Sequence, residues 1–264
     1  MKEISIDKYA RYYYLMVFVF IIKQFFDGLF LHQFNNPVLI YPHIDNSYWV
    51  FHLLQIPQFI VSNTYITIAF DLILISTSFA LIFLFKNRLL TRLFAIWFFI
   101  YFICVNSFSG HHSHMLVGIL LSNLIFCFND SNLQVKLIKW MRYYLLFIMS
   151  SAAIWKIWRG SVFDINHFSN LLYNQHIYEI YENKNGILMQ LIQYLITHKY
   201  FAHILYILAT GLELIFIIGF FTRKFDKILI SLFIVFFVMN YFLMGLNFVE
   251  LSILLLSFWR MKRD

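Results

Sequence analysis

Charged side chains in the outer and middle parts of otherwise apolar segments are the first candidates for chemistry. They are Lys23, Asp27, Asp71, Lys156, Glu213 and Glu250. A charged group inside a bilayer costs about 2.5–3.5 kcal/mol on insertion scales, so it usually faces a partner, water or a site. A lysine deprived of water can lose its charge and become a base. The similar depth of these groups in the predicted helices indicates one polar cavity that opens outward.

Each of these groups also has a structural explanation. Lys23 and Asp27 are four residues apart, so on a helix they can form an ion pair that neutralises both, with Asp71 as another partner. Glu213 and Glu250 can be satisfied by backbone groups or by Lys156. For Lys156 itself, the alternative is an ordinary interfacial lysine whose ammonium group extends to water.

Histidine is a second candidate because it supplies a proton acceptor or a metal ligand near neutral pH. All ten histidines map to the predicted outer side, and His111, His112 and His114 fall within four residues. Their H-H-x-H order lacks the helical-face spacing of H-E-x-x-H, so we predict a hydrogen-bonding or acid–base role and no metal site. Five others are expected to be interfacial residues: His32, His43, His52, His198 and His203.

The composition predicts that membrane helices carry these residues. The chain has 264 residues, of which 61% are hydrophobic and only 12% are charged, whereas a soluble domain averages roughly 25% charged residues. So few charged residues cannot cover the surface of a water-soluble fold. The same composition excludes a disordered chain, a collagen-like chain and a nucleic-acid-binding protein. We predict a multi-pass protein of the cell membrane, with the lipid bilayer as its main partner.

The apolar segments predict an all-α transmembrane bundle of about eight spans, in a single domain over residues 1–264. A span across about 30 Å of hydrocarbon needs roughly 20 apolar residues. The predicted spans are residues 10–31, 64–85, 89–108, 115–128, 140–158 and 200–221, followed by a hairpin of two short or tilted helices within 228–259. Between the spans, Gly186–Thr197 is expected to form an amphipathic segment at the interface.

Basic residues set the predicted orientation. Five clusters near the ends of the spans hold fifteen of the twenty Lys and Arg residues. With eight spans and a cytoplasmic N-terminus, all five clusters fall on the cytoplasmic side, as the positive-inside rule requires. Both termini are therefore predicted to be cytoplasmic. The net charge of +7 is then a consequence of topology, and it does not require an anionic partner.

Four local patterns occur in an order that points to a known family. They are the basic segment 86–92 leading to the Asn- and His-containing turn 105–114, the small-residue segment 151–156 ending in Lys156, Leu212-Glu213 before the basic turn 222–224, and the final hairpin with Asn240, Gly245 and Asn247. Together they resemble the HTTM family, the membrane domain of vitamin K-dependent gamma-carboxylases and their bacterial relatives.

This resemblance implies a site and a reaction. In such carboxylases a lysine deprotonates a reduced quinone, whose reaction with oxygen yields a stronger base that removes a glutamate gamma proton before carbon dioxide adds. Lys156 matches the position of that lysine. His112 resembles the turn histidine, which orients a reacting oxygen or stabilises charge. Glu213 and Asn240 would position or polarise groups. The implied cofactor is a reduced quinone, without a metal.

Two departures modify this expectation. The family tends to place a histidine where this chain has Asn240, and the chain ends at Asp264, directly after the membrane domain. Full gamma-carboxylation of a protein substrate is therefore expected to need a partner. The leading hypothesis is an outer-face membrane enzyme, or an enzyme subunit, that modifies or matures a secreted peptide.

A second hypothesis is a non-catalytic membrane partner or scaffold for peptide maturation, export or immunity, together with an accessory membrane or extracytoplasmic protein. In that case the same polar residues would be paired internally. A small transporter is disfavoured because the inner halves of the spans carry few polar groups for a continuous path.

The predicted topology can be tested by cysteine labelling. Ser109 and Ser131 flank the fourth predicted span, so Ser109→Cys and Ser131→Cys should react with an impermeant maleimide from opposite sides of the membrane. Labelling of both positions from the same side would refute the eight-span topology.

Overall fold

The computed structural model describes residues 3–34, 49–108, 116–182, 186–245 and 249–261, and these are helical apart from loops and one pair of two-residue strands. The predicted all-α class is therefore confirmed. By its internal contacts the chain forms two compact units. Unit 1 comprises residues 1–141 and 249–264, and unit 2 comprises residues 142–248. The assignment of 1–264 to a single domain stays a prediction.

Six helices in the described part of the chain are long and apolar enough to cross a membrane. They are α1 (Ile6–Phe26) with the 3₁₀ helix η1 (Leu31–Gln33), α4 (Thr64–Leu84), α5 (Arg88–Phe108), α7 (Ser131–Trp158), α11 (Lys199–Ile215) with α12 (Ile218–Phe221), and α13 (Asp226–Met244). These six match six of the predicted spans. A multi-pass membrane protein is the conclusion that their length and composition support.

The fourth and eighth predicted spans form shorter helical segments, so the number eight is not confirmed. The fourth consists of the π-helix η4 (Leu116–Leu120), α6 (Leu121–Leu124) and the 3₁₀ helix η5 (Ile125–Cys127). The eighth consists of α14 (Val249–Ser252) and the 3₁₀ helix η7 (Ile253–Phe258). Segments of this length rise roughly 15–20 Å, which is less than the hydrocarbon thickness of about 30 Å.

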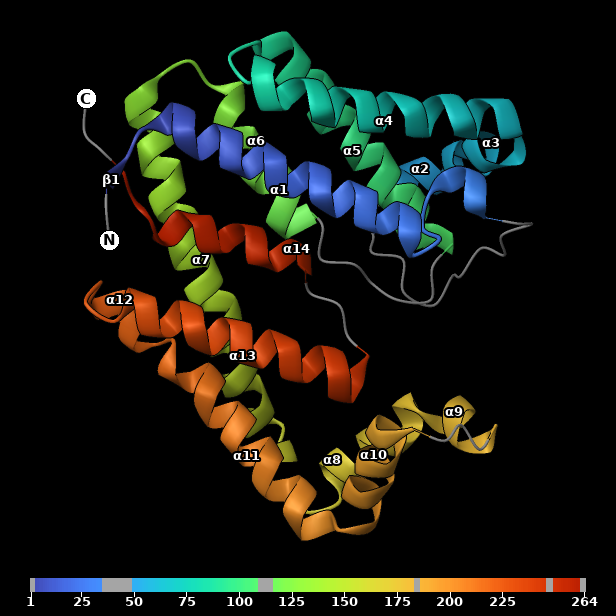
Figure 1. Ribbon diagram of the computed structural model, residues 1–264, viewed down its shortest axis with the longest axis vertical. Coiled ribbons are helices and arrows are strands. Elements are labelled where there is room, and N and C mark those ends of the chain that lie inside the picture. Colours follow the sequence, from blue (N-terminus) through green and yellow to red (C-terminus); the bar gives the residue numbers. More distant parts are fainter. Residues whose placement is uncertain (1–2, 35–48, 109–115, 183–185, 246–248, 262–264) are drawn as a thin grey trace. The chain divides into compact units, whose positions relative to one another are not determined.

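In unit 1, α4 packs against both α1 and α5, and the three helices run side by side in Figure 1. The short helices α2 (Trp49–Leu53) and α3 (Ile56–Ser62) complete this part of the unit, where α3 packs on α4 and α5. Buried tyrosines of α1 hold the fourth segment in place. Tyr13 donates a hydrogen bond to the carbonyl of Ile119 at 2.6 Å, and Tyr14 donates one to Asn123 Oδ1 at 2.9 Å.

The two short segments cross each other at a glycine. A Cβ atom at Gly118 would collide with the carbonyl oxygen of Glu250, so no larger residue fits without displacement of the backbone. Nearby, strand β1 (Glu3–Ile4) pairs in parallel with strand β2 (Arg260–Met261). The two described ends of the chain therefore lie side by side.

Unit 2 has its own small core. In it α10 (Ile187–Thr197) and α11 both pack on α8 (His167–Gln175). The short helix α9 (Ile177–Tyr181) follows α8 in the chain. The helix α10 is amphipathic, because the apolar Met189, Ile192 and Leu195 are buried whereas the polar Gln190 and Gln193 are exposed. The amphipathic segment predicted over residues 186–197 is thus confirmed as a helix.

Large apolar side chains also cover the outward surfaces of the long helices. Exposed examples are Phe79 and Phe83 on α4, Leu208 on α11, and Ile228 and Phe242 on α13. Soluble monomers rarely expose contiguous apolar surface on this scale. In a bilayer the same surface contacts lipid tails, so the exposure is consistent with six membrane-crossing helices.

One buried ion pair joins α7 to α13. Arg142 and Asp226 have side chains only 2% and 6% exposed, and Arg142 Nε lies 3.3 Å from Asp226 Oδ2. Arg142 also donates to the carbonyls of Gly219 and Thr222, at 3.0 and 3.3 Å, and Arg223 Nε donates to Asp226 at 3.2 Å. Arg142 and Arg223, two of the fifteen basic residues used for the orientation, are therefore both paired with Asp226.

Removing this carboxylate charge should destabilise the protein. In Asp226→Asn the buried Arg142 guanidinium loses its counterion, and we expect a loss of about 3 kcal/mol or more in the free energy of unfolding, measured by SDS titration in mixed micelles. The matched control is Asp7→Asn, which breaks the exposed ion pair with Lys86 and should cost less than about 1 kcal/mol. Equal losses in the two variants would show that Asp226 is not a structural anchor.

Candidate functional site

The structure brings together two of the predicted site residues, Lys156 and Glu213. Lys156 lies in the last turn of α7, and Glu213 lies on α11. The ammonium Nζ donates to both carboxylate oxygens of Glu213, each at 2.7 Å. The Glu213 side chain is 2% exposed, and the Lys156 side chain is 26% exposed. The carboxylate is therefore held inside unit 2, while the lysine remains accessible.

Local sequence explains why Lys156 ends up at the edge of a helix. A cationic side chain in the last turn is favoured by the partial negative charge of the helix C-terminus. The helix ends where Gly160 adopts a φ of 74°, a left-handed conformation that glycine accepts without strain. The 3₁₀ helix η6 (Ser161–Phe163) then turns the chain back, and Ser161 Oγ donates to the carbonyl of Lys156 at 2.9 Å.

Tyr206 completes the surroundings of the lysine. It lies seven residues before Glu213 on the same face of α11, and its ring centroid is 5.5 Å from Lys156 Nζ. Its hydroxyl lies 3.1 Å from Ser161 Oγ. The rings of His167 and Phe168 lie 5.2 and 5.6 Å from the Tyr206 ring. The Glu213 carboxylate and the Tyr206 ring therefore lie close to Lys156 Nζ. Around Tyr206 lie the Ser161 hydroxyl and the rings of His167 and Phe168.

Tyr206 and Ser161 were not among the site residues predicted from the sequence. The seven-residue spacing of Tyr206 and Glu213 was a usable signal, because such a spacing places two residues on one helix face. Ser161 carried no comparable signal, since its position depends on how the chain turns after α7.

Of the other two predicted site residues, only Asn240 lies in the described part of the chain, and it makes a hydrogen bond within its own helix. Asn240 is half-buried on α13, and its Nδ2 donates to the carbonyl of Phe236 on the same helix at 2.8 Å. That hydrogen bond turns the amide back onto its own backbone. His112, together with His111 and His114, lies outside the described residues.

The other charged candidates in the first two predicted spans, Lys23, Asp27 and Asp71, all have partners. Lys23 and Asp27 form the predicted intrahelical ion pair. Asp71 does not serve as the second partner of Lys23. Its carboxylate instead accepts from His32, whose Nδ1 lies 2.8 Å from Oδ2.

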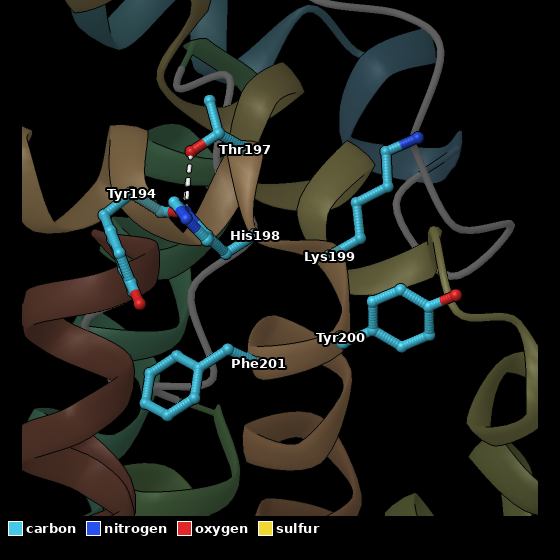
Figure 2. A pocket seen from close by; sticks show the side chains of 6 residues that line it. All are labelled: Tyr194, Thr197, His198, Lys199, Tyr200 and Phe201. Carbon is cyan, nitrogen blue, oxygen red and sulfur yellow. Dashed lines mark hydrogen bonds between the residues drawn. The ribbon is translucent and has the colours of Figure 1, made fainter.

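A shallow surface hollow of about 350 Å³ lies at the corner between α10 and α11 (Figure 2). It is lined by Tyr194, Thr197, His198, Lys199, Tyr200 and Phe201. Its histidine is already engaged, because His198 Nδ1 lies 3.0 Å from both Thr197 Oγ1 and the Tyr194 carbonyl. The hollow contains none of the predicted site residues.

The chemistry that the Lys156 cluster allows is proton transfer. The Nζ–H groups point at both Glu213 oxygens, so a proton can pass from the lysine to the carboxylate without rearrangement. In the described part of the chain, no three His, Cys, Asp or Glu side chains are grouped so as to hold a metal ion. The cluster is best described as a candidate acid–base site.

Comparisons with protein-family models, with curated proteins and with solved structures gave no match to this chain. The resemblance to the HTTM family stays a prediction that rests on the four short patterns in the sequence.

The coupling between Lys156 and Glu213 can be measured by a double-mutant cycle. Lys156→Met and Glu213→Gln should each cost about 2 kcal/mol in free energy of unfolding, because each leaves a buried or partly buried charge poorly paired. The double variant should cost less than the sum by about 1 kcal/mol or more. The exposed Lys199→Met is the control and should change stability by less than about 0.5 kcal/mol. Strict additivity would contradict the pairing.

Proposed function

We propose that this protein is a multi-pass enzyme of the cell membrane, or a subunit of one, that uses a membrane quinol to modify or mature a secreted peptide at the outer face. The observation that carries the proposal is the Lys156–Glu213 pair, in which an accessible amine meets a buried carboxylate at 2.7 Å. Charged groups at such depth usually mark a site or a partner. The proposal agrees with the HTTM-like pattern of the sequence.

In this proposal Lys156 is the base and Glu213 is its proton acceptor. A protonated lysine cannot remove a proton, so the amine must first be neutralised. Transfer of one Nζ proton to Glu213 leaves a neutral amine beside a neutral carboxylic acid, and apolar surroundings favour neutral forms. The neutral amine then takes a proton from a ligand hydroxyl through its free electron pair.

The groups around Lys156 fit a quinol. The Tyr206 hydroxyl and Lys156 Nζ can each bond a ring oxygen, and the Tyr206 ring adds aromatic surface 5.5 Å from Nζ. When bound, the quinol would supply the electrons for reaction with oxygen. His112 would orient the reacting oxygen, and Asn240 would polarise a group after a change of its present hydrogen bond.

The proposal includes eight crossings with both termini in the cytoplasm. Pairing of β1 with β2 brings the two ends of the chain together, which requires an even number of crossings. Arg88, the first residue of α5, donates to the carbonyl of Phe126 at 2.6 Å. Phe126 therefore lies beside the first residue of α5, and Phe108 is the last residue of that helix, which supports a fourth crossing.

A non-catalytic membrane partner is the second candidate function. The observation that favours it is the same ion pair, because Glu213 uses both oxygens on Lys156 and leaves neither charge uncompensated. In this case the pair would hold α7 against α11 and present a rigid surface to an accessory membrane or extracytoplasmic protein that matures or exports a peptide.

An oxygen-uptake assay distinguishes the enzyme from the non-catalytic partner. It measures quinol-dependent oxygen uptake by the full-length protein in nanodiscs, with reduced menaquinone as the probe. The enzyme proposal expects uptake by the unmodified protein and a loss of at least about 100-fold in Lys156→Ala, since a general base contributes that much or more. Lys139→Ala, at an exposed lysine of the same helix, should keep full uptake. Equal uptake in Lys156→Ala would eliminate Lys156 as the base, and no uptake in the unmodified protein would favour the partner.

A further inference from the structure

His32 and Asp71 form a second polar pair, in unit 1. Asp71 lies on α4 with its side chain only 3% exposed, while His32 lies in η1 with its side chain 32% exposed. His32 Nδ1 is 2.8 Å from Asp71 Oδ2. A buried carboxylate therefore holds one edge of a partly exposed imidazole ring.

The path of the chain after α1 creates this geometry. Gly28 adopts a φ of 72°, which reverses the chain and places η1 against α4. The backbone N–H groups of Leu31 and His32 then donate to Asp71 at 3.3 and 3.0 Å. The carboxylate thus receives two backbone donors in addition to the imidazole, and all three hold η1 in one position.

This arrangement fixes the tautomer of His32. An ionised carboxylate is only an acceptor, so Nδ1 must carry the hydrogen that bonds to Asp71. In the neutral ring Nε2 is then the unprotonated nitrogen, and the carboxylate increases its basicity. Among the described residues Nε2 has no hydrogen-bond partner.

The neighbours of the ring are mainly aromatic. The Phe25 and Phe30 rings lie 6.3 and 6.0 Å from the imidazole centroid, and Phe25 is exposed. Ionisable groups on the packed helices are engaged elsewhere: Lys23 pairs with Asp27, and Tyr101 donates to the carbonyl of Leu29 at 3.0 Å. Cys104 on α5 is buried. A ligand that reaches Nε2 therefore meets apolar rings and one basic nitrogen.

We propose that His32 and Asp71 form an acid–base site that takes the proton of a phenol-type ligand, meaning an apolar aromatic molecule with a weakly acidic hydroxyl. The ligand O–H bond breaks, its electron pair stays on oxygen, and the proton forms a new N–H bond at Nε2. Asp71 stabilises the resulting imidazolium, as the carboxylate does in a histidine–aspartate pair of a hydrolase. This site is independent of the function proposed for Lys156.

The probe is 4-nitrophenol, whose anion absorbs visible light whereas its neutral form does not. The full-length protein in nanodiscs, mixed with the probe at pH 6 after subtraction of empty nanodiscs, should give a saturable gain of anion absorbance. His32→Gln should abolish the gain, because glutamine can keep the hydrogen bond to Asp71 but cannot accept the proton. Asp71→Asn should weaken the gain at least about tenfold, the lower limit seen when an orienting carboxylate is removed.

Two controls isolate the site. Asp27→Asn makes the same chemical change at a carboxylate outside the pair and should leave the gain unchanged. Lys156→Ala should also leave it unchanged, so failure of the quinol proposal would not affect this result. The absence of a gain in the unmodified protein, or an equal gain in a folded His32→Gln protein, would overturn the proposal and leave His32 as a structural contact of η1.

Discussion

A charge that lies among apolar side chains must be compensated, and this constraint organises unit 2. Helix α7 carries Arg142 and Lys156, which are about 21 Å apart along the helix axis at 1.5 Å per residue. Each of them reaches a buried carboxylate on another helix, Asp226 on α13 and Glu213 on α11. Because an unpaired charge would cost several kcal/mol, these two contacts determine which faces of the helices meet.

Unit 1 satisfies the same requirement with hydrogen bonds and one histidine. Asp71 accepts hydrogen bonds from His32 and two backbone donors, and Asn123 accepts from Tyr14 while its Nδ2 donates to the carbonyl of Thr91 at 3.1 Å. Each bond joins segments that are distant in the sequence. Apolar side chains cover both the lipid-facing and the interior surfaces of the helices, so apolar contact alone does not specify which helix packs against which. The polar groups therefore specify the packing in unit 1.

The same constraint links structure to chemistry. A charge is retained in a membrane helix either because it holds the fold together or because it reacts, and exposure separates the two cases. Arg142 and Asp226 are both almost fully buried, which suits a structural anchor. Lys156 and His32 are instead partly exposed, each against a carboxylate that is nearly inaccessible. An accessible nitrogen oriented by a buried acid is the arrangement that proton transfer requires.

The sequence by itself determined the six long helices, because backbone hydrogen bonds within each helix are local and apolar length alone indicates a span. It also determined the Lys23–Asp27 pair, whose members lie one turn apart. It left open whether Lys156 paired with Glu213 or extended to water. Only the tertiary structure decided that contact and the assignment of Asp71 to His32. Partners far apart in the chain are chosen by which helix faces meet, and no local pattern encodes that choice.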